Sequence, residues 1–302
     1  MKNTISECFF ETAEKFNAKT ALLYKKGGVY FPITYKELAE RVKNFSTALK
    51  KLGVKKGDRV AILSENRPKW AVSDLAIISI GAVCVPCHTT FNPSVVQNIL
   101  NHSEAKVLIV SNRDLLNKVM VAEKNVDFLE KIIFMEKMTP DLEEIFHNKI
   151  ISWEKLLSDS LSEHSEQLEK LNIKGDDICS IIYTSGTTGI PKGVMLTHKN
   201  FISNVEAIDK AVPVKKSDTF LSFLPLSHIL EKTAGYYVPL FFGAKIAYAE
   251  SVKMLPLNLK EVKPTILISV PRIFEKFEDA IWDKVNQSKP LQKKSNLSNA
   301  KS

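Results

Sequence analysis

The sequence has few cysteines and no long uninterrupted hydrophobic run. Four cysteines in 302 residues are too few for the disulfide framework of a secreted protein of this size, which indicates a reducing compartment. The first residues, Met1–Glu7, lack the apolar core of a signal peptide. The longest apolar region, residues 70–87, contains Asp74 and Gly81 and is typical of a helix followed by a strand, not of a membrane span. We therefore expect a cytoplasmic protein.

Two of the cysteines have the spacing of a redox-active pair. Cys84 and Cys87 are separated by two residues, but they lie in an apolar segment that also fits a buried strand. There is no second cysteine pair for zinc, and the following histidines share no metal-ligand spacing: His88, His102, His147 and His164. We favour a role in the core over thiol chemistry and predict no zinc site.

Excess positive charge gathers at the C-terminal end. The chain has 42 basic and 34 acidic residues, a formal charge of +8, and 44% apolar residues, enough for a substantial core. Five lysines occur there without any acid: Lys284, Lys289, Lys293, Lys294 and Lys301. We interpret residues 286–302 as a solvated, disordered tail, with a peripheral contact with an anionic membrane as the alternative. The tail lacks interleaved aromatic residues, so nucleic acid is not an expected partner.

Helical and strand patterns alternate along the chain, which is typical of parallel sheets wrapped by helices. We predict a hairpin from residues 21–24 and 29–31, then a helix that starts with a capping box of Thr34 and Glu37 and ends near Leu52. Further strands are predicted at residues 59–63, 82–85, 106–110, 131–134, 178–183, 219–223, 244–248 and 265–270, with helices at about 68–80 and 94–102. Residues 139–177 are predicted to form a surface connection with short helices near 153–157 and 166–171. The predicted fold class is α/β, with doubly wound, mostly parallel sheets.

The most informative segment is Tyr183-Thr184-Ser185-Gly186-Thr187-Thr188-Gly189-Ile190-Pro191-Lys192-Gly193, which follows a predicted buried strand. Glycines let a backbone approach an anion closely, Thr and Ser hydroxyls add neutral donors, and Lys192 adds a positive charge. The segment therefore predicts a turn that binds phosphate. It is not the Gly-x-x-x-x-Gly-Lys-Ser/Thr loop of nucleotide hydrolases, because Pro191 stands five residues after Gly186. A glycine-rich connector without a ligand is the alternative.

The same eleven residues resemble the phosphate-binding loop of the adenylate-forming, or AMP-binding, enzymes. Residues 221–237 and 262–276 resemble, in addition, the long-chain acyl-CoA synthetases of that superfamily. The resemblance implies that residues 1–285 are an incomplete N-terminal AMP-binding (adenylation) domain. It also implies ATP-dependent activation of a long-chain fatty acid to an acyl-adenylate and then to an acyl-CoA, with ATP, Mg²⁺ and the co-substrate CoA.

The resemblance also implies roles for particular residues. The nucleotide phosphates would be bound by the loop residues Thr184, Ser185, Gly186, Thr187, Thr188, Gly189 and Lys192. Thr184 would contribute a hydroxyl to the Mg²⁺ shell. His228, in the segment Leu-Pro-Leu-Ser-His, would lie beside the carboxylate and adenylate, so that His228 and Lys192 are the catalytic candidates. A satisfied structural histidine is the alternative for His228.

Other residues allow two interpretations, one functional and one structural. Residues 236–242 are either a wall of an acyl tunnel or plain core. Arg272 either orients a carboxylate or pairs with Glu275 along a helix. At His198 and Lys199 we favour the start of a helix capped by Thr197 over a catalytic role.

Family members carry further motifs downstream: a magnesium-binding Glu, a ribose-binding Asp, a hinge and a C-terminal lysine. None of these is in the sequence, so we interpret the chain as the N-terminal part of such a synthetase, without its C-terminal domain, and expect weak ATP binding and little acyl-CoA formation. The alternatives are a non-catalytic nucleotide- or fatty-acid-binding module, half of a split enzyme, and a ligase for another carboxylic acid. The sequence indicates neither the acyl chain length nor the oligomeric state.

Overall fold

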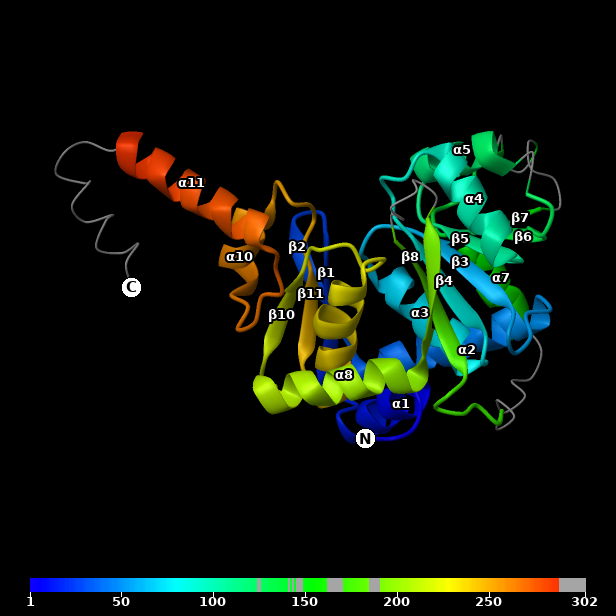
Figure 1. The fold of residues 1–302 in the computed structure, drawn as a ribbon, viewed down its shortest axis with the longest axis horizontal. Helices are drawn as coiled ribbons and strands as arrows, with labels where there is room; N and C mark the ends of the chain where they lie inside the picture. The colour runs from blue at the N-terminus through cyan, green and yellow to red at the C-terminus, as the bar shows by residue number, and fades with distance from the viewer. Residues whose placement is uncertain are drawn as a thin grey trace.

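The computed structural model describes residues 1–123, 126–140, 142, 144, 149–161, 171–184 and 191–287. Within these residues the chain forms two β-sheets (Figure 1). The smaller sheet has the order β10 (Thr219–Ser222), β11 (Lys245–Tyr248), β1 (Thr20–Lys26), β2 (Val29–Thr34). The larger sheet has the order β7 (Ile150–Ser152), β6 (Lys131–Phe134), β5 (Val107–Val110), β3 (Arg59–Leu63), β4 (Val83–Cys87), β8 (Ile178–Thr184), β9 (Lys192–Thr197).

Helices cover both sheets. They are α1 (Ile5–Lys15), α2 (Tyr35–Lys51), α3 (Pro68–Ser79), α4 (Pro93–Ser103), α5 (Arg113–Glu123), α7 (Trp153–Leu161), α8 (His198–Ala211), the π-helix η1 (Glu231–Tyr237), α9 (Val238–Phe242), α10 (Leu255–Val262) and α11 (Pro271–Gln287). In the larger sheet the strands are parallel except for the pair β8 and β9, and in the smaller sheet except for β1 and β2. The predicted α/β class with mostly parallel sheets is confirmed.

One large core joins the two sheets. It contains Leu22 and Ile246 of the smaller sheet, Val60 and Ile109 of the larger sheet, and buried side chains of α1, α2, α3, α8, η1 and α9. A second core lies on the other face of the larger sheet beneath α4 and α5, and a third, smaller one lies beside α10. The elements between the sheets are therefore apolar on more than one side, which the continuous burial of α3 illustrates.

Local sequence signals account for several elements. The predicted hairpin forms, with Gly27 and Gly28 at φ +57° and +83° in its turn. The capping box of Thr34 and Glu37 begins α2, which ends before Gly53 at φ +93°.

The predicted strand at residues 265–270 is wrong. Only Ile266 forms an isolated bridge, with Phe220 of β10, and the amides of Thr265 and Ile266 both donate to the carbonyl of Thr219. The segment is apolar enough for a strand, but β10 offers it a partner on one side only and Pro271 starts α11 directly afterwards. A strand depends on partners that local sequence does not specify.

The predicted connection between residues 139 and 177 also differs in part. Its helix near Trp153 is confirmed as α7, but the short strand β7 precedes it and was not predicted. The second helix, expected at residues 166–171, lies almost wholly outside the described residues.

Cys84 and Cys87 lie in β4, where every residue is buried, and both thiols are free. Burial raises the pKa of Cys87 to about 12 and that of Cys84 well above its usual value. Since the thiolate is the reactive form, these cysteines are core residues, as favoured from sequence.

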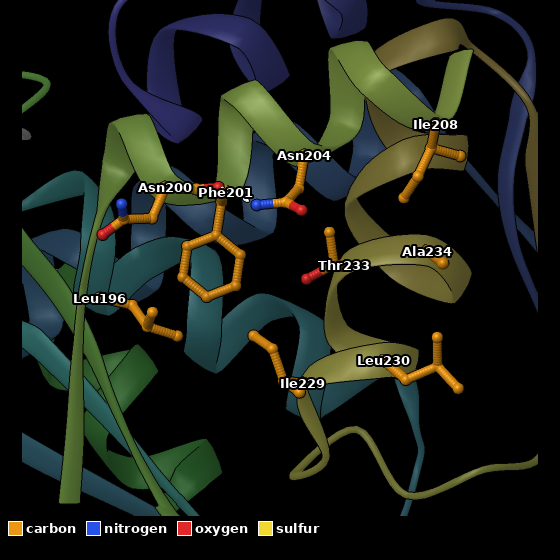
Figure 2. A pocket seen from close by; sticks show the side chains of 9 residues that line it. All are labelled: Leu196, Asn200, Phe201, Asn204, Ile208, Ile229, Leu230, Thr233 and Ala234. Atoms are coloured by element: carbon orange, nitrogen blue, oxygen red, sulfur yellow. Dashed lines mark hydrogen bonds between the residues drawn. The ribbon is translucent and has the colours of Figure 1, made fainter. Parts of the chain in front are cut away.

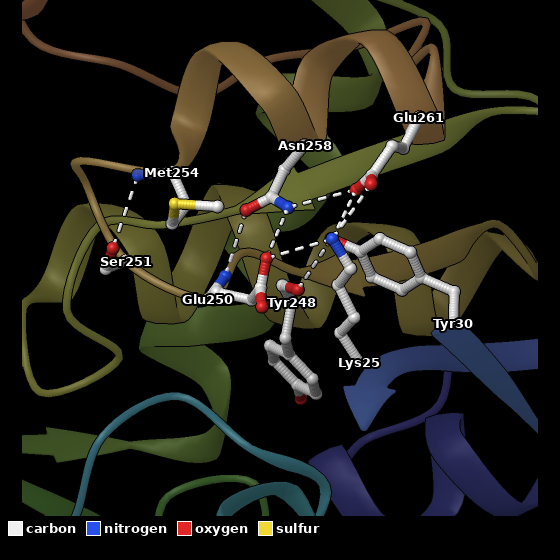
Figure 3. A network of polar contacts seen from close by, with 8 residues as sticks. All are labelled: Lys25, Tyr30, Tyr248, Glu250, Ser251, Met254, Asn258 and Glu261. Atoms are coloured by element: carbon white, nitrogen blue, oxygen red, sulfur yellow. Dashed lines mark hydrogen bonds and ion pairs between the residues drawn. The ribbon is translucent and has the colours of Figure 1, made fainter. Parts of the chain in front are cut away.

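A polar network attaches α10 to the smaller sheet (Figure 3). Lys25 of β1, whose side chain is 5% exposed, lies 2.8 Å from Glu261 Oε2 of α10 and 3.0 Å from Glu250 Oε2 beyond β11. Asn258 Nδ2 donates to the same Glu250 oxygen at 3.0 Å, and Tyr30 donates to the carbonyl of Tyr248. Each charge in the network thus has an opposite charge or a donor as its partner.

Gly243, the residue after α9, provides a test of the packing between α1 and α9. It has φ +72°, and a Cβ there would overlap the ring of Phe16. We expect Gly243→Ala to lower the free energy of unfolding by about 3 kcal/mol, through left-handed strain plus overpacking. Gly28→Ala is the control, because its φ is +83° with no atom within 4 Å of the added Cβ, and should cost only about 1 kcal/mol. Equal losses in urea unfolding would show that the overlap with Phe16 is unimportant.

Candidate functional site

The predicted phosphate-binding segment is the connection of an antiparallel hairpin. Thr184, the last residue of β8, pairs with Lys192, the first residue of β9, and both side chains are exposed. Ser185, Gly186, Thr187, Thr188 and Gly189 lie outside the described residues. Lys192 was predicted as part of a turn but begins a strand, so it lies directly opposite Thr184. The two described residues of the predicted site are thus brought together.

Close packing in the hairpin requires glycine after Lys192. A Cβ on Gly193 would lie 2.9 Å from Ile181 Cγ2 and 3.1 Å from Tyr183 Cζ. The hydroxyl of Tyr183 lies 2.7 Å from His102 Nδ1 of α4, which holds this tyrosine on the other face of the sheet from α8. Close packing therefore fixes the ends of β8 and β9 that precede and follow the loop.

His228 follows β10 in a tight turn and is exposed. Its Nδ1 accepts a hydrogen bond from the Leu230 amide at 3.3 Å, so the neutral imidazole carries its proton on Nε2. The amide of His228 donates to the carbonyl of Pro225 at 2.9 Å. The ring is thereby oriented by its own backbone, and Nε2 is the nitrogen able to donate to an anionic oxygen.

Asn66, from the loop after β3, holds the turn before His228 across the gap between the two sheets. Its Nδ2 donates to Ser222 Oγ at 3.0 Å and to the carbonyl of Leu224 at 2.7 Å, and its Oδ1 accepts from the Leu226 amide at 3.0 Å. Sequence reasoning missed Asn66, because a single asparagine in a polar loop carries no recognisable signal.

His88 is a second residue that the sequence analysis did not assign to the site. Its ring centroid lies 6.3 Å from that of His228. Burial, and to a lesser degree the neighbouring His228, lowers the pKa of His88, so His88 is a neutral imidazole at physiological pH. Two imidazoles, one directly after β4 of the larger sheet and one in the turn after β10 of the smaller sheet, therefore lie near one another.

A cavity of about 280 Å³ lies between β9 and α8 on one side and the helical segment after His228 on the other (Figure 2). One wall is Leu196 of β9, the strand that begins at Lys192, and another is the helical segment that begins directly after His228. The cavity is lined by Leu196, Asn200, Phe201, Asn204, Ile208, Ile229, Leu230, Thr233 and Ala234. Most of these side chains are aliphatic or aromatic, so the cavity suits an apolar ligand.

Residues 236–242, for which a tunnel wall and plain core were the two alternatives, do not line this cavity and belong largely to the buried core. Tyr236 and Tyr237 are fully buried and pack against each other with ring centroids 4.9 Å apart. The cavity instead uses residues one turn earlier in the helical segment, because that segment turns its Ile229, Leu230, Thr233 and Ala234 side toward α8.

The remaining candidates divide between structure and surface. Thr197 caps the start of α8, as predicted, and the cap is a capping box with Asn200. His198 is buried, its Nδ1 accepts from the Ile5 amide at 3.2 Å, and burial lowers its pKa to about 4, which is typical of a structural imidazole. Lys199 pairs with Asp176 at 2.8 Å, and Arg272 is exposed on α11.

The side chains that could bind Mg²⁺ can be compared with the ligands that this ion requires. Among the described residues there is no group of three or more His, Cys, Asp or Glu side chains that could bind a metal ion by themselves. Magnesium in nucleotide sites keeps several waters and takes most other ligands from phosphates, so one exposed hydroxyl, that of Thr184, is compatible with it. In the part of the chain that the structure describes, no helix is both long and apolar enough to cross a membrane.

Comparison with known proteins agrees with these features. The family model described as AMP-binding enzyme matches residues 9–301. The chain is 33% identical to the mouse long-chain-fatty-acid–CoA ligase ACSBG2 over 96% of its own length and 44% of the relative. It is 30% identical to fatty acyl-CoA synthetase A of Dictyostelium discoideum over 89% of its length and 40% of the relative. The chain therefore spans less than half the length of these relatives.

Solved structures share the fold. A long-chain-fatty-acid–CoA ligase (FadD1) from Archaeoglobus fulgidus has a TM-score of 0.79 at 24% identity, covering 93% of this chain and 54% of that one. The anthranilate CoA ligase AuaEII, solved with anthranoyl-AMP, also has a TM-score of 0.79, at 23% identity, covering 91% of this chain and 52% of that one. With a family model that extends over nearly all of its residues, the chain belongs to the AMP-binding enzyme family.

Proposed function

We propose that this chain is the part of a long-chain fatty acid–CoA ligase that binds ATP and the fatty acid. A carboxylate oxygen of the fatty acid attacks the α-phosphorus of ATP, pyrophosphate leaves, and the acyl-adenylate forms. The CoA thiol then attacks the acyl carbon and displaces AMP. The single observation that carries the proposal is the apolar cavity between β9, which begins at Lys192, and the helical segment that begins after His228.

Each part of the site has a role in this reaction. Thr184, Lys192 and the loop between them bind the triphosphate, and the Thr184 hydroxyl joins the shell of Mg²⁺, which neutralises phosphate charge. The Nε2–H of His228 donates to the fatty-acid carboxylate or to the oxygen of the adenylate that develops charge. The wall residues Leu196, Ile229 and Ala234 exclude water from the acyl chain.

The class of carboxylic acid substrate is inferred from the cavity, because ligases for different acids share this fold. Ligases for aryl acids and for long-chain acids have equal TM-scores with this chain. Five aliphatic side chains and one aromatic ring, beside three polar side chains, line the cavity and favour an alkyl chain. The long-chain ligases are also the relatives of highest identity named above.

The proposal is tested by calorimetry of the chain with Mg-ATP and with palmitate. We expect both to bind, and we expect Ala234→Phe, which fills the cavity, to weaken palmitate binding about tenfold or more and leave Mg-ATP binding unchanged. Ala234→Leu is a milder variant for the case that Phe unfolds the helix. Leu257→Phe, at an exposed position on α10 outside the cavity, is the matched control. Absence of palmitate binding, or equal binding by Ala234→Phe, would exclude this cavity as the acyl site.

A further inference from the structure

A buried ion pair lies behind the cavity wall. Lys232 of η1 and Asp74 of α3 are both 0% exposed, and Lys232 Nζ lies 2.8 Å from Asp74 Oδ1. The other carboxylate oxygen of Asp74 accepts a hydrogen bond from the Tyr237 hydroxyl at 2.8 Å. Burial is the largest single influence and would lower the pKa of Lys232, but the charge and hydrogen bond of Asp74, together with the neighbouring Cys84 and Cys179, outweigh it and raise that pKa to about 12. Lys232 is therefore charged in the folded protein.

The same ammonium reaches the strand that leads to the phosphate-binding loop. Lys232 Nζ donates to Ser180 Oγ at 3.2 Å, and Ser180, on β8, in turn donates to the carbonyl of Cys84 on β4 at 3.0 Å. Thr184 ends the same strand. One side chain of η1 thus has partners on α3 and on β8.

Lys232 also contacts the cavity wall from behind. Its Nζ lies 5.8 Å from the ring centroid of Phe201, which lines the cavity, and 5.6 and 5.9 Å from those of Trp70 and Tyr237. The faces of these aromatic rings attract the ammonium group, and the rings exclude water from around it. The next residues along η1, Thr233 and Ala234, face the cavity itself.

Burial of a charge pair is a costly way to hold two helices together. Well-packed apolar side chains of similar volume are often as stabilising, so an ion pair is weak evidence for stability and better evidence for a required geometry. A charged pair tolerates little displacement, since a shifted ammonium would lose Asp74, Ser180 and the rings together.

We propose that Lys232 is a positioning residue that fixes the acyl-pocket wall formed by η1 and Phe201 relative to β8, and so sets which acyl chain lengths fit. Lys232 does not touch the fatty acid; it acts through Phe201, Thr233 and Ala234. The inference rests on the proposed function, because it assigns the cavity to the acyl chain.

The test compares wild type with the double variant Asp74→Asn/Lys232→Met, which removes both charges and keeps side-chain volume. Lys232→Met alone would leave Asp74 as an unpaired buried charge and destabilise the fold strongly. We expect the double variant to fold and the ratio of dissociation constants for dodecanoate and palmitate to change about fivefold or more. A residue that only stabilises the fold would leave that ratio unchanged. We also expect faster amide hydrogen exchange over residues 229–237.

An unchanged ratio in a folded double variant overturns the inference. If the wild-type chain binds neither fatty acid, the proposed function fails, and the positioning role of Lys232 is then judged from hydrogen exchange alone. Faster exchange over residues 229–237 in the double variant supports that role, and unchanged exchange overturns it. Should the double variant not fold, Ser180→Ala takes its place, because it removes the link from Lys232 to β8, together with the bond from Ser180 to Cys84, and leaves both charges in the protein. We expect Ser180→Ala to change the ratio of dissociation constants and the rate of hydrogen exchange in the same direction as the double variant, by smaller amounts. If neither quantity changes, the proposal is contradicted.

Discussion

Replacing Lys192 and Thr184 together by alanine is expected to weaken binding of Mg-ATP by about 100-fold, because a hydrogen bond to a charged group contributes about 1.5–3 kcal/mol and 1.4 kcal/mol corresponds to tenfold in affinity. The two residues face each other across the ends of β8 and β9. Both side chains are exposed, so their removal should leave the fold intact. Calorimetry of the variant, together with its thermal unfolding curve, measures both expectations.

Two controls make this result specific. Lys210→Ala removes an exposed lysine near the end of α8 and should leave Mg-ATP affinity unchanged, which excludes a general effect of net charge. Thr184→Ser keeps the hydroxyl and should retain binding, whereas Thr184→Ala should not. Unchanged nucleotide affinity in a folded Lys192/Thr184 double alanine variant would falsify the assignment of the hairpin to phosphate.

Glu231→Gln is expected to make the protein much more stable at alkaline pH and to change its stability by less than about 1 kcal/mol at pH 5. Glu231, in the first turn of η1, is 1% exposed, and its Oε1 accepts from Ser222 Oγ at 2.6 Å. Burial raises its pKa to about 8. The carboxyl group is therefore protonated in the folded protein over a range in which the unfolded chain has lost the proton.

The sign follows from proton linkage. Between pH 4.5, the ordinary pKa, and pH 8 the folded state binds more protons than the unfolded state, so the contribution of Glu231 to stability falls as pH rises, by about 1.4 kcal/mol per pH unit, and levels off above pH 8. Glutamine remains neutral throughout. The variant should therefore exceed wild type by about 4–5 kcal/mol at pH 8.5.

Urea unfolding of both proteins between pH 5 and pH 8.5 measures this difference. Ser222→Ala is the control, because it removes the hydrogen bond to Glu231 but keeps the ionisable group, so its decline in stability with pH should persist. Parallel curves for wild type and Glu231→Gln would mean that Glu231 does not become charged on unfolding in this range.

Much of the local structure could be predicted from short stretches of sequence. The capping boxes at Thr34 and Thr197, the Gly27-Gly28 turn and the apolar strands of the larger sheet are specified by neighbouring residues. These signals act within a few residues, so they can be recognised in the sequence without knowledge of the fold.

The prediction of secondary structure failed where a segment's structure depends on a partner that is distant in the sequence. Residues 265–270 are apolar but meet only β10, and β9 was not recognised as a strand because its pairing with β8 lies across the loop. The sequence left residues 236–242 open between a tunnel wall and core, and which residues of that helical segment turn toward α8 could not be predicted from its composition.

The amino-acid sequence by itself determined the candidate phosphate-binding segment, the family resemblance and the α/β class, since each depends on residue types at fixed short spacing. Only the tertiary structure decided that Lys192 lies opposite Thr184, that Asn66 and His88 lie beside the turn of His228, and that Lys232 pairs with Asp74. The physical reason is that such contacts join residues up to about 160 positions apart, and close packing of two sheets around shared helices, not any local propensity, brings them within hydrogen-bond distance.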